Sequence, residues 1–203
     1  MIIAVASYKG GVGKTTTAIH VAGYLQLDGP TLLVDGDAIR SATRWYARGN
    51  DIGLPFRVCS FAAMSKHSEG KRHIIIDTEG NPDDTAFKEL CETADLVIVP
   101  AAPESVATDG LTYTLQKLVD FNCSSYRVLL TMIAPPPRSD AAQLRTALEA
   151  RKIPMFAAGI PRLAAFEKAA SAGILVGAVG RDVNAARGAA AYESVGKEIL
   201  HGR

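Results

Sequence analysis

Short apolar runs alternate along the chain with stretches in which apolar residues recur at helical spacing. Most of the runs are nearly continuous in Val, Ile, Leu and Ala, which is typical of strands buried on both faces. The predicted strands span residues 2–7, 31–35, 55–61, 73–77, 95–100, 126–133 and 155–160. The predicted helices span residues 15–27, 39–48, 83–93, 104–120, 139–151, 163–171 and 185–200.

This alternation predicts a doubly wound α/β fold, because buried strands joined by helical crossovers form a mostly parallel sheet with helices on both faces. The chain has 203 residues, a length that fits a single domain over residues 1–203. No internal repeat or linker divides it.

Composition narrows the class of protein. With 48% hydrophobic and 21% charged residues, the chain has the balance of a folded globular protein. The formal net charge is +1, so binding to nucleic acid would need a local basic cluster. Cys59, Cys91 and Cys123 are too scattered for a disulfide framework or a paired-cysteine zinc site. Without a signal peptide or an apolar run of membrane-spanning length, the expected location is the cytoplasm.

A glycine-rich loop stands between the first predicted strand and the first predicted helix. In this context successive backbone N–H groups and the helix N-terminus bind phosphate oxygens. Lys14 would reach the β and γ phosphates, and the Thr15 hydroxyl would bind Mg²⁺. The predicted nucleotide-binding residues here are Gly10, Gly11, Val12, Gly13, Lys14, Thr15 and Thr16.

A second lysine, Lys9, opens this loop, which reads KGGVGKTT. The motif resembles the deviant Walker A motif of the ParA/MinD family of ATPases. The resemblance extends through residues 95–111 and 159–176 and so covers nearly the whole chain. It implies that Lys9 acts in trans, reaching the phosphates of the ATP held by the partner subunit of a nucleotide-sandwich dimer.

Two carboxylates follow the second predicted strand, in the sequence Asp35-Gly36-Asp37-Ala38. Open α/β sheets place their ligand sites at such strand ends. The family resemblance implies that Asp37 positions or activates the attacking water and that Asp35 supports the Mg²⁺ shell. Ala38 stands where the family usually has proline, so the hydrolysis rate does not follow from the resemblance.

Two further segments match the family. Asp77 ends the apolar strand HIIID and resembles the Walker B acid that serves the metal, followed by Glu79 and Gly80 where a γ-phosphate sensor would lie. Pro161 and Arg162 belong to a segment that resembles the family's adenine-binding loop. The implied cofactors are ATP and Mg²⁺.

By resemblance the protein is an ATPase that forms a homodimer with ATP, binds DNA non-specifically and associates with the nucleoid. A small adaptor of the ParB or McdB type would stimulate hydrolysis, and the cargo would be a plasmid, a chromosome region or a protein assembly such as a carboxysome. The chain starts directly at its first strand, so no N-terminal helix-turn-helix domain is expected.

Two other functions compete with this one. A MinD-like membrane-surface switch is the main alternative, but residues 189–203 carry glutamates beside a single lysine, so core packing explains their apolar face better. We therefore expect no membrane partner. A P-loop ligase such as dethiobiotin synthetase is disfavoured by Lys9.

Candidate DNA-binding clusters are less specific. Arg40, Arg44 and Arg48 recur every four residues, and Arg138, Arg145 and Lys152 recur every seven, so each set is expected on one helical face. A solvated helix face is the favoured interpretation of both sets. Cys91 and Cys123 are interpreted as structural cysteines rather than iron–sulfur ligands, and no metal beyond Mg²⁺ is expected.

Overall fold

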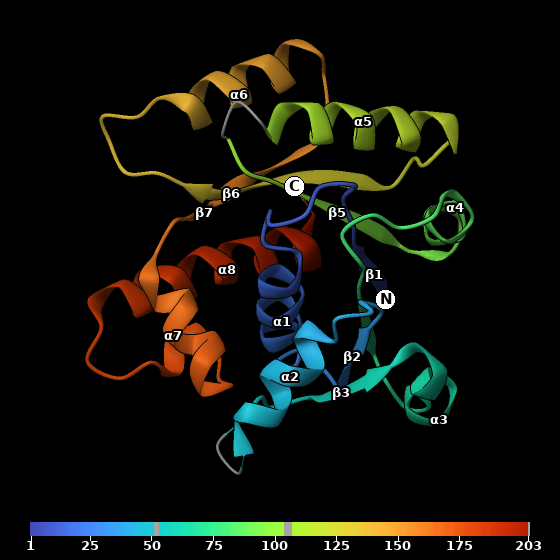
Figure 1. The fold of residues 1–203 in the computed structure, drawn as a ribbon, viewed down its shortest axis with the longest axis vertical. Coiled ribbons are helices and arrows are strands. Elements are labelled where there is room, and N and C mark those ends of the chain that lie inside the picture. The colour runs from blue at the N-terminus through green and yellow to red at the C-terminus, as the bar shows by residue number, and fades with distance from the viewer. Residues whose placement is uncertain (51–52, 104–106, 203) are drawn as a thin grey trace.

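Seven parallel strands form one sheet within the described part of the chain (Figure 1). The computed structural model describes residues 1–50, 53–103 and 107–202, and only the backbone of residues 107–109. The strand order is β3-β2-β4-β1-β5-β6-β7. The strands are β1 (Ile2–Val5), β2 (Thr31–Asp35), β3 (Arg57–Ser60), β4 (His73–Asp77), β5 (Leu96–Ala101), β6 (Tyr126–Ile133) and β7 (Met155–Pro161). The predicted parallel α/β fold is confirmed.

The helices are α1 (Lys14–Leu25), α2 (Ser41–Arg48), α3 (Met64–Ser68), α4 (Asp84–Thr93), α5 (Ala107–Asp120), α6 (Asp140–Ala150), α7 (Ala164–Ala172) and α8 (Val183–His201), with 3₁₀ turns η2 (Phe61–Ala63) and η3 (Val176–Ala178). Helices α1 to α6 lie between successive strands, and α7 and α8 follow β7. All but α3 match the predicted helices to within a few residues. Residues 104–106, predicted as the start of a helix, lie outside the described residues.

The prediction was wrong in two places. The first strand ends at Val5 rather than residue 7, because the chain turns there into the glycine-rich loop. The strand predicted at 55–61 covers only Arg57–Ser60, and Phe61 begins η2, which leads into α3. This helix was not predicted, because five residues are too few to show a helical period.

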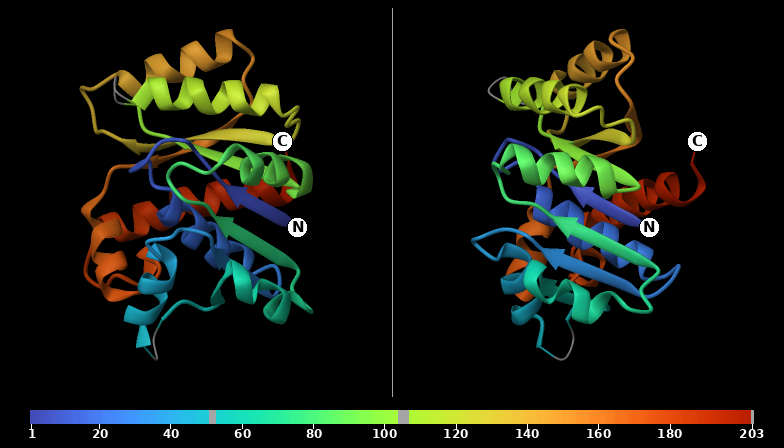
Figure 2. Two further views of the ribbon diagram at one scale, coloured as in Figure 1. Left: turned by 45° about the vertical axis from the view of Figure 1, so that its right-hand side comes forward. Right: turned by 90° about the vertical axis from the view of Figure 1, so that its right-hand side faces the viewer.

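Alternate residues of each central strand face opposite helical layers. In β1, Ile3 belongs to the buried cluster that includes residues of α1, α2, α7 and α8, whereas Ala4 belongs to the cluster that includes residues of α4, α5 and α6. Figure 2 shows these helices on the two sides of the sheet. Both faces are therefore apolar, which explains the nearly continuous hydrophobic runs.

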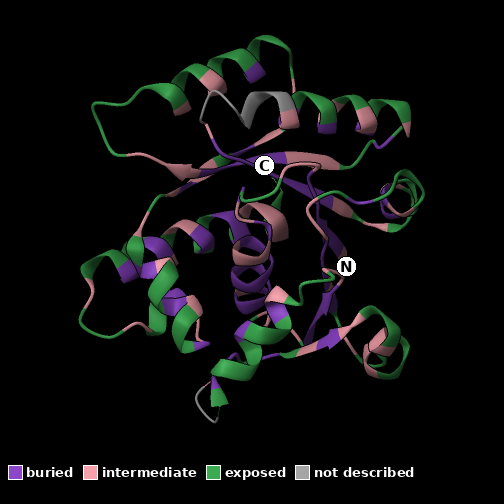
Figure 3. Cartoon of the chain, in the orientation of Figure 1, coloured by how far each residue is buried: buried purple, intermediate pink, exposed green. Residues whose placement is uncertain are grey.

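Helix α1 is the most enclosed connection, as its buried colouring in Figure 3 shows. Helix α8 packs directly on it, so closely that a Cβ atom on Gly196 would lie 2.0 Å from Cδ1 of Tyr24. Tyr192 and Val195 of α8 are buried in the same core. The prediction that the C-terminal apolar face packs into the core is thus confirmed.

The sheet brings the predicted site residues to one edge. In the parallel register Asp77 pairs with Val5 of β1 on one side and with Asp35 of β2 on the other. The loops that follow β1, β2 and β4 therefore leave the sheet next to each other, at the carboxyl ends of the strands.

Candidate functional site

The loop after β1 turns into α1 through glycines in left-handed conformations. Gly11 has φ 75° and Gly13 has φ 86°, values that a residue with a side chain adopts only with strain. Gly13 is also the N-cap of α1 and offers no capping side chain. The first N–H groups of the helix are thus left for an anionic ligand.

Lys14 is buried within this loop. Its Nζ donates a hydrogen bond of 2.9 Å to the carbonyl of Lys9. Burial lowers the pKa of Lys14, while the carboxylates of Asp77 and Asp37 act in the opposite direction. The ammonium therefore lies among the loop and both carboxylates.

Gly80 lies against the same loop. A Cβ atom on Gly80 would be 3.6 Å from Cα of Gly10 and 3.8 Å from Nζ of Lys14. The segment after β4 therefore borders the space beside Lys14, where a γ-phosphate sensor was predicted.

Asp77 is a buried carboxylate without a well-formed hydrogen bond on either oxygen. Burial raises its pKa to about 7; the nearby Thr15 hydroxyl opposes this rise and the charge of Asp35 adds to it. A buried, unpaired carboxylate beside a hydroxyl suits a cation, so these residues fit Mg²⁺. No cluster of three or more His, Cys, Asp or Glu that could hold a metal occurs among the described residues.

Asp35 holds the loop that leads into α2. Its Oδ2 accepts hydrogen bonds from the backbone N–H and the hydroxyl of Thr43, at 2.8 and 2.5 Å, and its Oδ1 accepts from the N–H of Asp37 at 3.2 Å. Asp35 therefore supports the position of Asp37. The carboxylate of Asp37 is itself only half-buried and accepts from the N–H of Ile39 at 3.0 Å.

Residues 8 and 9 are fixed against α4 and α5. The N–H of Tyr8 donates to Oγ1 of Thr114 at 3.1 Å, and its hydroxyl donates to Asp84 at 2.8 Å. The Lys9 side chain lies on α5, because a Cβ atom on Gly110 would be 2.8 Å from Cβ of Lys9. Sequence reasoning missed these contacts. Asp84 and Thr114 lie 76 and 106 positions after Tyr8, and no local motif links them to it.

A pocket of about 230 Å³ adjoins the loop. Gly13 and Thr16 form its loop side, and Phe166 and Tyr192 contribute aromatic rings from α7 and α8. The predicted adenine-binding residues Pro161 and Arg162 line it too. The structure therefore brings this distant segment to the phosphate-binding loop.

His20 supports this pocket from behind and was not predicted to do so. Its Nδ1 lies 2.7 Å from the carbonyl of Thr16, and its Nε2 accepts from the N–H of Val176 at 3.0 Å. Because Nε2 accepts, the ring is neutral with its proton on Nδ1. It stacks on Tyr192 with ring centroids 4.7 Å apart, and burial lowers its pKa to about 4.

The two basic sets were candidates for DNA contact, with a solvated helix face as the favoured interpretation, and their expected placement on single helical faces needs correction. Arg138 and Lys152 lie outside α6, so they do not share one helical face with Arg145. The guanidinium of Arg145 donates to the carbonyls of Phe156 and Ala157 at 3.2 and 3.1 Å. Phe156 and Ala157 belong to the edge strand β7. The Arg145 guanidinium therefore caps backbone carbonyls of the sheet and does not contribute to an open basic surface.

In the other set, Arg48 donates from Nε to the carbonyl of Ala170 at 2.7 Å. Arg40 precedes α2 in a left-handed conformation, with φ 60°. Arg40 and Arg44 are exposed, whereas Arg48 is tied to α7.

No described helix is long and apolar enough to cross a bilayer.

Two known proteins are similar in sequence to this chain. The chain is 32% identical over 203 residues to the maintenance of carboxysome distribution protein A of Gloeobacter kilaueensis, covering 98% of this chain and 93% of that protein. It is 28% identical to the protein ParA of Rhizobium radiobacter, over 68% of this chain and 67% of that protein.

Solved structures share the fold. The complex of Cyanothece McdA(D38A) with ATP superposes with a TM-score of 0.76 over 100% of this chain and 96% of that chain, at 16% identity. The family model described as the CobQ/CobB/MinD/ParA nucleotide binding domain matches residues 3–176. The chain therefore belongs to the CobQ/CobB/MinD/ParA family of nucleotide-binding domains.

Proposed function

We propose that this protein is a Mg²⁺-dependent ATPase that dimerises around ATP, binds DNA as the dimer and positions an intracellular cargo. The observation that carries the proposal is the arrangement at the end of β1. There the buried ammonium of Lys14, the unpaired carboxylate of Asp77 and Gly80 border one glycine-rich loop. A triphosphate with a divalent cation complements these charges.

Each residue would have a distinct task. The N–H groups of residues 10–16 and the ammonium of Lys14 bind the phosphates, and the pocket at Phe166 and Tyr192 takes the base. Thr15 and Asp77 would hold Mg²⁺, with Asp35 supporting its shell, and the ion would neutralise charge on the phosphates. Asp37 orients the attacking water, because phosphoryl transfer depends mainly on positioning and charge.

The similarity to the carboxysome distribution protein favours a protein assembly as cargo, with a plasmid as the alternative suggested by the similarity to ParA. A small adaptor protein would bind the ATP dimer and stimulate hydrolysis. The proposed location is the cytoplasm, at the nucleoid.

Two lysine variants test the nucleotide site and the dimer separately. Lys14→Ala removes the counter-charge within the loop, so ATP affinity should fall by at least about 30-fold, the loss expected for one charge-assisted bond of about 2 kcal/mol. Lys9→Ala should keep ATP affinity within about twofold, because in our proposal its target lies in the other subunit. Calorimetric titration measures both affinities.

Sedimentation with ATP then reports the dimer. Wild-type protein should sediment as a dimer with ATP and as a monomer with ADP, and Lys9→Ala should remain monomeric with either. A Lys14→Ala protein with unchanged nucleotide affinity would refute the site. A fully dimeric Lys9→Ala protein would refute the trans role alone.

A further inference from the structure

Three cationic side chains and a histidine gather beside β3, at one edge of the sheet. Arg57 begins β3, Lys66 and His67 lie in α3, and Lys71 stands two residues before β4. Nη1 of Arg57 and Nδ1 of His67 are 3.0 Å apart. Figure 1 shows α3 beside β3, far from α6. We call these four residues the β3-edge patch.

The cations of the β3-edge patch have no carboxylate partner in the described part of the chain. Arg57, Lys66 and Lys71 form no ion pair within the described residues. Glu69, which follows α3, is exposed and, in the part of the chain that the structure describes, forms none with them. Partial burial, together with the positive charges of Arg57, Lys66 and Lys71, lowers the pKa of His67. These charges therefore act on the same small region and create a positive potential there.

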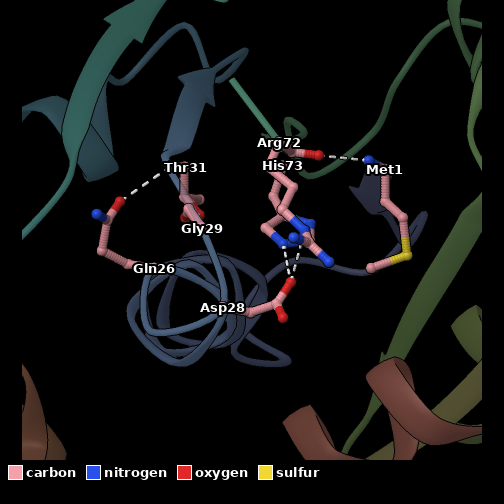
Figure 4. Close-up of polar contacts among 7 residues, drawn as sticks. All are labelled: Met1, Gln26, Asp28, Gly29, Thr31, Arg72 and His73. Atoms are coloured by element: carbon pink, nitrogen blue, oxygen red, sulfur yellow. Dashed lines mark hydrogen bonds and ion pairs between the residues drawn. The ribbon is translucent and has the colours of Figure 1, made fainter. Parts of the chain in front are cut away.

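The next basic residue, Arg72, shows the contrast. Its Nε lies 2.9 Å from Oδ2 of Asp28, which also lies 2.8 Å from Nε2 of His73 (Figure 4). Arg40, Arg44, Arg138, Arg151 and Lys152 are also exposed without an ion pair in the described chain, but several other exposed cations are engaged with carboxylates. They include Lys88 with Glu92, Lys168 with Asp182 and Lys197 with Glu193.

We propose that the β3-edge patch is the surface that contacts the phosphate backbone of duplex DNA. The inference deepens the DNA-binding part of the proposed function and rests on it. Charge complementarity carries it, because unpaired Lys and Arg side chains displace counterions from DNA without reading sequence. His67 adds a donor: since its Nδ1 accepts from Arg57, its Nε2 carries a hydrogen that can bond a phosphate oxygen.

The composition of the patch favours DNA over an anionic membrane. Membrane-surface helices place large apolar side chains beside the basic ones. Helix α3 instead reads Met-Ser-Lys-His-Ser, and its residues Ser65 and Lys66 are polar. The exposed ring of Phe61 lies elsewhere, close to Gly36 at the nucleotide edge of the sheet.

The patch also lies away from the nucleotide. Arg57 starts its strand and Lys71 precedes one, so both belong to the amino ends of the parallel strands. Lys14, Asp37 and Asp77 lie at the carboxyl ends. DNA and ATP can therefore occupy the protein together.

The test compares two neutralised surfaces of equal charge. The patch variant is Arg57→Gln/Lys66→Gln/Lys71→Gln. The matched control is Arg138→Gln/Arg151→Gln/Lys152→Gln, three exposed cations around α6 near the opposite edge of the sheet. Each protein is titrated with ATP onto a fluorescent duplex of arbitrary sequence at several salt concentrations. ATP affinity and the melting temperature serve as checks on folding.

The patch variant should bind DNA at least about tenfold more weakly near physiological salt, because each chain then neutralises three fewer phosphates. Its slope of log affinity against log salt should be shallower, by about 0.9 for each phosphate that the variant leaves without a cation. The control should keep the wild-type affinity and slope. The same proteins are also sedimented with anionic vesicles.

Four results overturn the inference. Wild-type affinity and slope in the patch variant refute it while leaving the proposed function intact, as does equal weakening of both variants. Loss of vesicle binding with unchanged DNA binding reassigns the patch to lipid. If wild-type protein with ATP binds no DNA, the DNA-binding part of the proposed function fails, and this inference fails with it.

Discussion

His20 shows how one residue links the nucleotide pocket to the core. Its neutral ring joins the first turn of α1, through Thr16, to η3, through Val176. It also stacks on Tyr192 and lies edge-on to Phe166, with centroids 5.4 Å apart. Both aromatic residues line the pocket proposed for the base. The His20 ring therefore holds Phe166 and Tyr192 in position behind the pocket, although His20 does not line the pocket itself.

The lowered pKa of His20 predicts a loss of stability in acid. The folded value is about 4 and the unfolded value 6.5, so between these limits the unfolded chain binds more protons. Stability from this group is complete above pH 6.5 and falls as the pH drops toward 4. At pH 4.5 the loss should be about 2 to 3 kcal/mol, from 1.36 kcal/mol for each pKa unit.

Urea unfolding at pH 7, 5.5 and 4.5 measures this loss. His20→Gln should be less stable than wild type at pH 7 because the Val176 N–H loses its partner, but its stability should fall less on acidification. His201→Gln, at the exposed end of α8, is the matched control and should follow wild type. Parallel pH dependence in wild type and His20→Gln would contradict the assignment.

At the scale of elements, the strands were the most predictable part of the chain. β4 and β6 were predicted at their observed bounds, because their apolar runs are nearly continuous and end in clear breaks. Helix ends were less predictable. The interpretation of Arg138 and Lys152 as part of a helical face failed because helix α6 ends on both sides before reaching them.

The protection of β7 could not be predicted, since it depends on side chains that are distant in sequence. β7 is an edge strand, with its register to β6 interrupted by irregularities. Glu198 of α8 accepts hydrogen bonds from the N–H groups of Ala157 and Ala158 at 2.9 and 2.8 Å. Arg145 of α6 covers carbonyls of the same strand. The edge is thus closed to pairing with another strand.

Glu198→Ala should destabilise the protein by about 1 to 2 kcal/mol, because two N–H groups lose their acceptor and water replaces it only in part. Glu193→Ala removes an exposed carboxylate of the same helix, paired with Lys197, and should cost less than about 0.5 kcal/mol. Chemical denaturation of both variants measures the difference. Equal stabilities would show that water satisfies the β7 N–H groups equally well.

At the scale of the whole molecule, the site residues come from segments that only the parallel sheet brings together. Sequence motifs identified Lys14, Asp37, Asp77 and the Pro161–Arg162 segment, and the structure places these around one loop and its adjoining pocket. The β3-edge patch has no such motif. Arg57, Lys66 and Lys71 are separated in sequence, and only the packing of α3 beside β3 collects them.

The nucleotide should control DNA binding through the number of these patches in one particle. A monomer presents the three cations of the patch, Arg57, Lys66 and Lys71, and a dimer would present six. Because each phosphate contact contributes about 0.9 to the salt slope, the dimer should show a contribution of about 5 where the monomer shows about 3. Wild-type protein with ATP should therefore bind duplex DNA of any sequence, and the ADP form should bind far more weakly.

Lys9→Ala separates dimerisation from nucleotide occupancy in this prediction. With ATP bound but no partner subunit, it should show the weak affinity and shallow salt slope of the ADP form, although its β3-edge patch is unchanged. Equilibrium titration of a labelled duplex, with ATP or ADP at several salt concentrations, provides all four curves. If ATP and ADP give equal affinity in wild-type protein, dimerisation does not gate DNA binding. If Lys9→Ala with ATP binds as tightly as wild type, ATP itself rather than pairing of the two patches controls the DNA surface.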